Sequence, residues 1–226
     1  MINSDDLINK VKSYNKFLNP ETLNKAYNFA VKAHENQKRY SGDPYSIHPI
    51  AVANILTELK LDSATIATGL LHDTIEDTYA TYETIRGEFG QEVADLVDGV
   101  TKISVFENQA VANSKAENFR KLILATSKDI RVLLVKIADR LHNMRTIKAI
   151  PKIEKRQRIA QETMEIYAPL ADRMGMHRIR DELEDLSFEI LNNEARELIK
   201  NKLDEIKSDK KDLFESLSFE LSEILN

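Results

Sequence analysis

The chain has 226 residues, of which 42% are hydrophobic, and it contains no cysteine. That is enough apolar material for a sizeable core, and the missing cysteines exclude disulfides, thiolate zinc sites and a cysteine nucleophile. No apolar run is long enough to span a bilayer, and residues 1–6 lack the features of a secretory signal, so we expect a soluble, cytoplasmic protein. A net charge of −5 argues against DNA or RNA binding and leaves room for a small anionic substrate.

Apolar positions recur mostly three and four residues apart, which predicts an all-α fold. The expected helices, in chain order, span residues 22–37, 50–59, 63–77, 82–88, 92–101, 114–127, 130–147 and 155–167. Asp62 is a natural N-cap for the third of these, and Pro49 and Pro151 suit helix starts, where a missing amide proton costs little. Residues 38–47 form the clearest loop, and the polar stretch 106–112 is a second candidate loop.

The sequence changes character after residue 180, where apolar residues give way to a tail rich in lysine and glutamate. This pattern predicts two or three amphipathic helices attached to the main bundle. We therefore divide the chain into a main domain, residues 1–180, and appended helices, residues 181–226. The appended helices are expected to pack on a neighbouring part of the chain or to form a homodimer.

His72 and Asp73 follow the apolar run 66–71, which places an imidazole and a carboxylate where water is scarce. Such burial is costly unless something binds there. His48 follows the first loop, and Asp139 lies in the expected helix 130–147. Two imidazoles and two carboxylates suit Mn²⁺, Fe²⁺, Co²⁺ or Zn²⁺, and the types of ligand do not decide among them.

Glu76 and Asp77 lie one helical turn beyond His72 and Asp73. Carboxylates beside a metal can accept a proton from an activated water and orient that water. The same pair could simply complete a solvated helix end, and the spacing favours neither interpretation. A second helical stripe carries Asp139, Asn143 and Thr146, with Arg145 close by.

The other histidines lack a setting rich in metal ligands. We expect His34 and His177 to be structural, since a lone histidine is more often a hydrogen-bonded packing residue than a ligand. His142 lies three residues after Asp139 and is assigned a structural or supporting role.

The chain contains several characteristic stretches: RYSGDPY at 39–45 with His48-Pro49, GLLHDTIEDT at 69–78, DGVTK at 98–102, KIADRLHNMRT at 136–146 and ETMEIYAPLADR at 162–173. Together they resemble the N-terminal hydrolase region of the RelA/SpoT alarmone proteins. The resemblance extends from about residue 23 to residue 191, in order and without large gaps. The combination is far more specific than any single histidine-aspartate pair.

The resemblance implies an HD-superfamily helical fold that removes the 3′-pyrophosphate of ppGpp and pppGpp with a metal-activated water, usually with Mn²⁺, which ends the stringent response. The implied residues are His48, His72, Asp73 and Asp139 as metal ligands, Glu76 and Asp77 as the water-activating pair, and Arg39, Tyr40, Ser41, Asn143, Arg145 and Thr146 as substrate contacts. Tyr40 departs from members that carry a second basic residue at that position.

Two other functions stay open at this point. A metal-dependent phosphatase could act on another 3′-phosphorylated nucleotide such as NADPH, and a regulatory module could bind the alarmone without turnover. The acidic pair favours an enzyme, because binding alone needs no water-activating carboxylates. The tail offers no synthetase residues, so the chain is expected to be either a hydrolase-only or split form or a piece of a longer protein.

Overall fold

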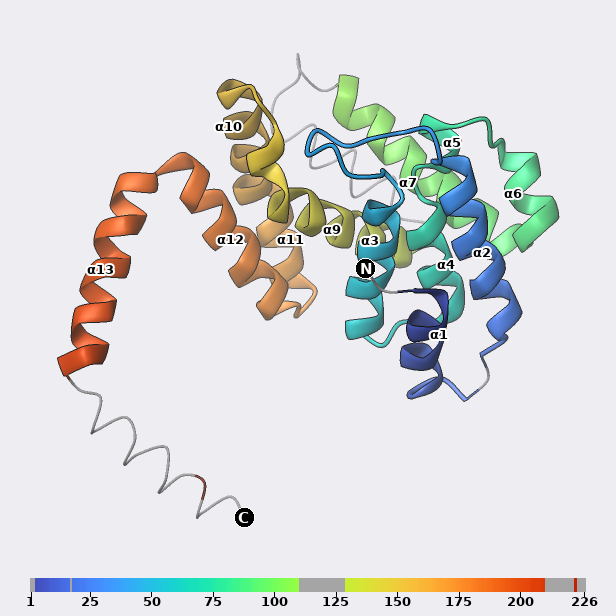
Figure 1. Cartoon of the computed structure of the whole chain (residues 1–226), viewed down its shortest axis with the longest axis horizontal. Helices are drawn as coiled ribbons and strands as arrows, with labels where there is room; N and C mark the ends of the chain where they lie inside the picture. Colours follow the sequence, from blue (N-terminus) through green and yellow to red (C-terminus); the bar gives the residue numbers. More distant parts are fainter. Residues whose placement is uncertain (1–2, 17, 110–128, 210–221, 223–226) are drawn as a thin grey trace.

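The computed structural model describes residues 3–16, 18–109, 129–209 and 222. Within these ranges the chain is helical, and its one extended contact is an isolated bridge between Lys38 and Pro44, which confirms the all-α fold class. Figure 1 shows the arrangement. The elements are α1 (Ser4–Lys12), α2 (Pro20–Ala33), α3 (Ile47–Glu58), α4 (Ser63–Leu71), α5 (Thr74–Asp77), α6 (Tyr82–Phe89), α7 (Gln91–Gln109), α9 (Ile130–Arg145), η2 (Ile147–Ala149), α10 (Ile153–Glu162), η3 (Thr163–Tyr167), α11 (Ala168–Arg173), α12 (His177–Leu191) and α13 (Asn193–Asp209).

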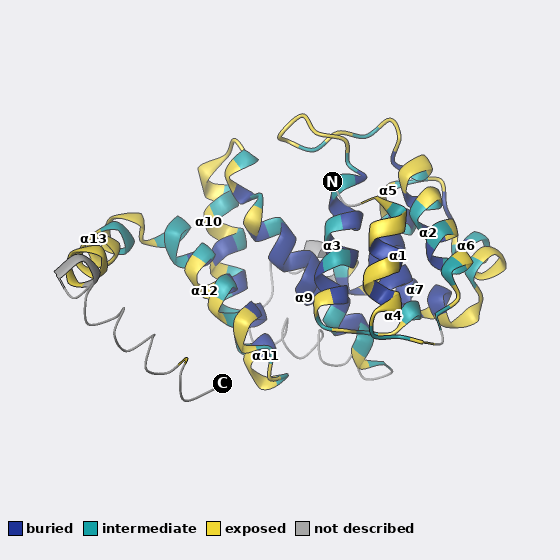
Figure 2. Cartoon of the chain, turned by 60° about the horizontal axis from the view of Figure 1, so that its bottom comes forward, coloured by how far each residue is buried: buried dark blue, intermediate teal, exposed yellow. Residues whose placement is uncertain are grey.

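Helices α3, α4 and α9 form the buried centre of the bundle (Figure 2). Helix α4 packs on α2, α3 and α7, and α9 packs on α3, α7 and α12. Every residue of α4 from Thr65 to Leu71 is buried. A helix that is apolar on all sides lies inside the core, so the residues at its C-terminal end enter the interior of the bundle.

The local start and stop signals act as the sequence predicts. The side chain of Asp62 accepts a hydrogen bond from the backbone N–H of Thr65 at 3.0 Å, which confirms it as the N-cap of α4. Pro49 lies in the first turn of α3, where its missing N–H leaves no helical bond unmade. Pro151 lies just before α10, and Gly90 ends α6 with a φ of +88°.

The expected helix 63–77 is wrong in one respect, because the structure divides it into α4 and α5. The ring Nδ1 of His72 lies 2.9 Å from the Gly69 carbonyl oxygen, and the Thr74 hydroxyl donates to the Leu71 carbonyl at 2.6 Å. A side chain that hydrogen-bonds to one of the last carbonyls of a helix competes with the backbone N–H groups that would continue the helix. Helix α4 therefore ends at Leu71, and α5 begins at Thr74.

Other boundaries also differ. Helix α7 continues to Gln109, so residues 106–109 of the expected loop 106–112 are helical; no glycine or proline interrupts them. The expected helix 114–127 lies outside the described residues. The helix expected at 155–167 begins at Ile153 and changes into the wider π turn η3 after Glu162. Helix α1, which the sequence pattern does not predict, buries Leu7 and Val11 against α2 and α3.

The amphipathic helices expected after residue 180 correspond to α12 and α13. Helix α12 packs on α9, α10 and α11, and the expected division at 180/181 falls inside it. Helix α13 extends away from the bundle (Figure 1) and exposes Leu198, Ile199, Leu203 and Ile206. A partner for this face stays a prediction. Among the described residues, no helix combines the length and the apolar character needed to cross a bilayer.

Candidate metal centre and its cavity

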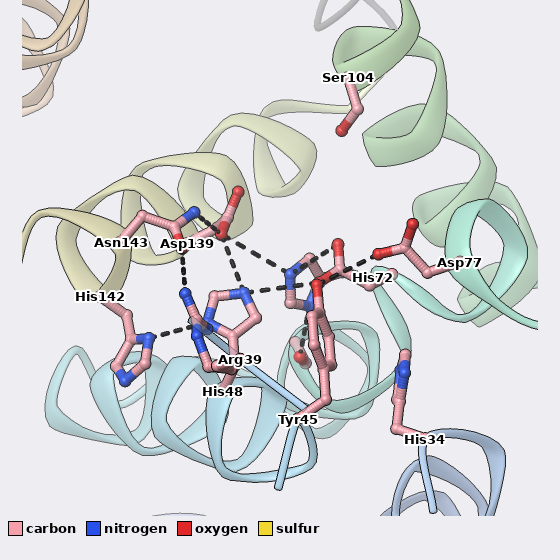
Figure 3. Close-up of polar contacts among 12 residues, drawn as sticks. His34, Arg39, Tyr45, His48, His72, Asp77, Ser104, Asp139, His142 and Asn143 are labelled. Atoms are coloured by element: carbon pink, nitrogen blue, oxygen red, sulfur yellow. Dashed lines mark hydrogen bonds and ion pairs between the residues drawn. The ribbon is translucent and has the colours of Figure 1, made fainter. Parts of the chain in front are cut away.

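The expected ligands from three separate segments meet in the interior (Figure 3). In α3, the Nε2 atom of His48 lies 3.1 Å from Oδ1 of Asp139 and 3.5 Å from Oδ2 of Asp73. After α4, the Nε2 atom of His72 lies 3.1 Å from Oδ1 of Asp73 and 3.8 Å from Oδ1 of Asp139. One ligand atom from each of His48, His72 and Asp139 lies within 4.8 Å of the others.

This donor set fits a divalent cation. The Nδ1–H of His72 donates to the Gly69 carbonyl, so Nε2 is the nitrogen directed at the carboxylates. That Nε2 atom is buried and has no hydrogen-bond partner among the described residues. Since buried polar atoms are normally paired, an unpaired nitrogen facing two carboxylates is what a cation site requires.

The electrostatics of the cluster support the same interpretation. Burial alone would lower the pKa of His72, but Asp73 and Asp139 outweigh it and raise this pKa to about 10. Burial alone would raise the pKa of Asp73, yet His72 and His48 hold it well below its usual range. Without a cation His72 is therefore protonated and the buried carboxylates are ionised, so a divalent cation would take the place of this proton beside the two carboxylates.

Asp139 is held from both sides on α9. The Nζ atom of Lys136 donates to Oδ2 of Asp139 at 3.0 Å, and the Asn143 amide donates to Oδ1 at 2.7 Å. Burial would raise the pKa of Asp139, but Lys136, His48 and His72 keep it well below its usual range. Lys136 also donates to the Ser104 hydroxyl of α7 at 3.2 Å.

The acidic pair on α5 lies next to this cluster. Burial first, and then the charges of Asp73 and Asp77, raise the pKa of Glu76; burial and Asp73 raise that of Asp77. The hydroxyl of Tyr45 donates to Oδ2 of Asp73 at 2.8 Å and to Oδ2 of Asp77 at 3.1 Å. Tyr45 therefore joins a candidate ligand to a candidate base.

A cavity of about 790 Å³ opens beside Asp139. Helix α9, the loop after α2, and the segment from α10 to η3 form its walls. Its lining includes Lys38, Arg39, Tyr40, Ser41, Tyr45, Lys136, Asp139, Arg140, Asn143, Thr146, Lys155, Arg158, Glu162 and Glu165. Among the described residues, Lys38, Arg39, Lys155 and Arg158 have no carboxylate partner within 4.0 Å. A cavity wall with this positive charge favours an anionic ligand.

A family model described as HD domain matches residues 26–177. The chain belongs to the HD domain family. The matched region of this HD domain runs from within α2 to the first residue of α12 and includes all the candidate ligands.

The resemblance to RelA/SpoT proteins is confirmed over nearly the whole HD-domain chain. A GTP pyrophosphokinase rsh of Brucella melitensis is 50% identical over 99% of this chain and 30% of its own length. A guanosine-3′,5′-bis(diphosphate) 3′-pyrophosphohydrolase of Haemophilus influenzae is 49% identical over 85% of the chain and 28% of its own. The bifunctional (p)ppGpp synthase/hydrolase SpoT of Escherichia coli is 48% identical over 89% and 28%. The chain thus spans under a third of these relatives.

A solved structure of a metazoan SpoT ortholog, described as one that hydrolyses ppGpp and plays a role in starvation responses, is similar to this HD domain. The TM-score is 0.56 at 26% sequence identity, and the match covers 78% of this chain and 97% of the other.

Most of the expected substrate contacts line the cavity of the HD domain. The guanidinium of Arg39 donates to Asn143 at 2.9 Å and to Thr146 at 3.5 Å, and its Nη1 atom is buried with no hydrogen-bond partner among the residues that the structure describes. Tyr40 is largely exposed, with the Lys155 ammonium 5.3 Å from its ring centroid. Ser41 also lines the cavity.

Arg145 is the exception among the expected contacts. Its guanidinium forms two hydrogen bonds with Glu182 of α12, at 2.6 Å and 2.8 Å, and it does not line the cavity. The expected contact between Arg145 and substrate has no support in this arrangement. Its observed contact instead fixes α12 against α9.

The remaining histidines have distinct surroundings. His34 is buried and stacks on Tyr45 with ring centroids 4.7 Å apart, and His177 is exposed beside Asp172. Nδ1 of His142 lies 2.7 Å from Nδ1 of His48. Burial first, and then the nearby charges of His48 and Arg39, lower the pKa of His142 to about 3.

Sequence reasoning missed Tyr45 and Lys136. Each lies three residues before a candidate ligand, His48 and Asp139 respectively, so the helical spacing was available as a signal for Lys136. Tyr45 precedes α3, and its contact with α5 depends on how the loop folds back, which no local spacing encodes.

Proposed function

We propose that this HD domain hydrolyses the 3′-pyrophosphate of ppGpp and pppGpp to GDP or GTP and pyrophosphate. The observation that carries the proposal is a buried histidine-aspartate cluster beside a cavity whose lining includes four cations with no carboxylate partner among the described residues. The names of the Haemophilus and Escherichia relatives and the described activity of the metazoan ortholog support the substrate.

A divalent cation, which we infer to be Mn²⁺ ahead of Fe²⁺, Co²⁺ or Zn²⁺, would be held by His48, His72, Asp73 and Asp139. When bound, it would lower the pKa of a coordinated water and offset negative charge on the phosphoryl oxygens. These ligands would not need to rearrange when the cation binds. Hydrogen bonds with Lys136, Asn143, Tyr45 and the Gly69 carbonyl already fix their positions.

Glu76 and Asp77 are the proposed proton acceptor and water-orienting group. Their pKa values are raised, which makes each a better proton acceptor once it is ionised than an ordinary surface carboxylate. Tyr45 donates to Asp77 and so fixes the direction of one of its lone pairs.

The cavity suits one nucleotide that carries several phosphates. Small-molecule sites commonly occupy roughly 300–1,000 Å³, and this cavity falls within that range. We infer that Arg39, Asn143 and Thr146 hold the nucleotide near the cation site, with Tyr40 and Ser41 at the entrance. A small nucleotide in the cytoplasm, rather than DNA, RNA or a membrane, is therefore the proposed partner.

Product analysis tests this proposal. With Mn²⁺ and ppGpp, the wild-type chain should release GDP and pyrophosphate, detected by anion-exchange chromatography and ³¹P NMR. The Asp73→Asn variant keeps the side-chain shape but removes a charged ligand, so turnover should fall to background while the fold, checked by circular dichroism, persists.

Parallel incubations with pppGpp and with NADPH distinguish the proposed function from the two alternatives. Phosphate release from NADPH without pyrophosphate release from ppGpp would contradict the proposed substrate. Tight ppGpp binding without turnover, with Mn²⁺ present, would instead establish a binding module.

A further inference from the structure

The two candidate imidazole ligands are supported in different ways. His72 donates from Nδ1 to the Gly69 carbonyl, an atom that can only accept, so the tautomer of His72 is fixed by the backbone. His48 faces another imidazole instead, since its Nδ1 atom lies 2.7 Å from Nδ1 of His142 (Figure 3). An imidazole nitrogen can either donate or accept, so this contact alone leaves two tautomers open.

Both rings are buried, with His48 2% exposed and His142 8% exposed. Two nitrogen lone pairs that face each other at this distance would repel and leave both nitrogens without a hydrogen bond. One of the two nitrogens must therefore carry a hydrogen that points at the other. If His142 provides that proton, Nε2 of His48 carries a hydrogen directed at Asp139 and cannot bind a cation. If His48 provides it, Nε2 of His48 keeps its lone pair.

We propose that His142 is a positioning residue that accepts the Nδ1–H of His48 and thereby holds His48 in the tautomer that binds the cation. This inference rests on the cation site of the proposed function but not on the identity of the substrate. Helix α9 then contributes twice to the site: Asp139 contacts Nε2 of His48 from one side and His142 contacts Nδ1 from the other.

The position of His142 on the helix explains why the contact is possible. Residues three apart on a helix share a face, so Asp139 and His142 both face α3 when α9 packs on it. Asn143, the next residue, contacts Asp139 and Arg39 and does not reach His48 in any described contact. The supporting role therefore belongs to His142 and not to its polar neighbour.

Two substitutions at this position separate hydrogen bonding from packing. In His142→Asn the amide oxygen can take the place of the accepting nitrogen, whereas His142→Leu fills the buried site but offers no acceptor. A packing role predicts that leucine is the better replacement in this buried position. A positioning role predicts that asparagine is the better one.

The readout is Mn²⁺ binding to the full chain without nucleotide, measured from the electron paramagnetic resonance signal of free Mn²⁺. Loss of such a supporting contact typically weakens metal affinity by about 10- to 100-fold, so we expect that loss in His142→Leu and near wild-type affinity in His142→Asn. The thermal midpoints of the metal-free variants report packing separately.

A second readout follows the tautomer itself. With diamagnetic Zn²⁺ bound, ¹⁵N NMR should place the hydrogen of His48 on Nδ1 in the wild type and in His142→Asn. Equal Mn²⁺ affinity in the two variants, or wild-type affinity in His142→Leu, would overturn the inference. A wild-type chain that binds no cation would overturn the inference and the proposed site together, whereas failure to cleave ppGpp would affect only the proposed function.

Discussion

At the scale of single residues, Asp139 links the cation site to the cavity. Its Oδ1 atom faces His48 and accepts from Asn143, and its Oδ2 atom accepts from Lys136. Asn143 in turn accepts from Arg39, so a change at Arg39 reaches the candidate ligand Asp139 through two hydrogen bonds. The geometry of this candidate ligand and the position of Arg39 in the cavity are therefore coupled through one carboxylate.

The raised pKa values of Glu76 and Asp77 predict a pH dependence of the rate. A proton acceptor works only when ionised, so kcat/KM should fall as the pH drops below its pKa. Since Asp77 contributes to raising the pKa of Glu76, Asp77→Asn should lower that pKa and move the acid limb of the pH–rate profile to lower pH.

Glu76→Gln should bind Mn²⁺ but lose about 100- to 10,000-fold in rate.

Steady-state rates across pH for the wild type and both variants provide this test, with Mn²⁺ binding measured alongside. An acid limb that does not move in Asp77→Asn would remove Glu76 as the titrating base. Full activity in Glu76→Gln would have the same consequence.

At the scale of elements, the close packing of α4 on α3 sets the position of His72. A Cβ atom added at Gly69 would lie 2.5 Å from Cδ1 of Leu56 and 3.4 Å from Cα of Ala53. Leu56 and Ala53 are fully buried, so neither has free space to move into. Only glycine allows α4 to approach α3 this closely while its carbonyl accepts from His72.

Gly69→Ala should therefore destabilise the chain, whereas Gly87→Ala in α6 should not. Overpacking a core costs about 1–3 kcal/mol, and this exceeds the gain of up to about 1 kcal/mol in helix propensity. A methyl group at Gly87 meets no atom of the described residues within 4 Å, so the propensity gain remains there. Thermal unfolding of both variants should give midpoints that shift in opposite directions.

Mn²⁺ affinity should also fall in Gly69→Ala and stay unchanged in Gly87→Ala, because only the first displaces the carbonyl that orients His72. A Gly69→Ala chain as stable as the Gly87→Ala chain would refute the packing argument.

Helical periodicity predicted most elements, because caps such as Asp62 and apolar stripes are local features. The break between α4 and α5 was missed because it depends on side chains of His72 and Thr74 bonding to carbonyls. The candidate ligands could be proposed from the sequence because each stands in a short characteristic stretch. Their meeting point depends on how α3, α4 and α9 cross, which periodicity does not encode.

At the scale of the whole molecule, the cavity joins segments that are distant in the sequence. The loop after α2 supplies Arg39 and Tyr40, whereas α10 supplies Lys155 and Arg158. The sequence indicates the loop side but not the α10 side, and from it we expect Arg145 to contact substrate. In the structure Arg145 faces α12, where Glu182 provides a carboxylate within reach.

We propose that His48, His72, Asp73 and Asp139 together bind one divalent cation. Crystals of the full chain grown with Mn²⁺, with data collected at the manganese absorption edge, would locate that cation. We expect one strong anomalous peak roughly 2.0–2.3 Å from both Nε2 atoms and from oxygens of both carboxylates. Anomalous peaks only at exposed carboxylates, with none between the two imidazoles, would contradict it.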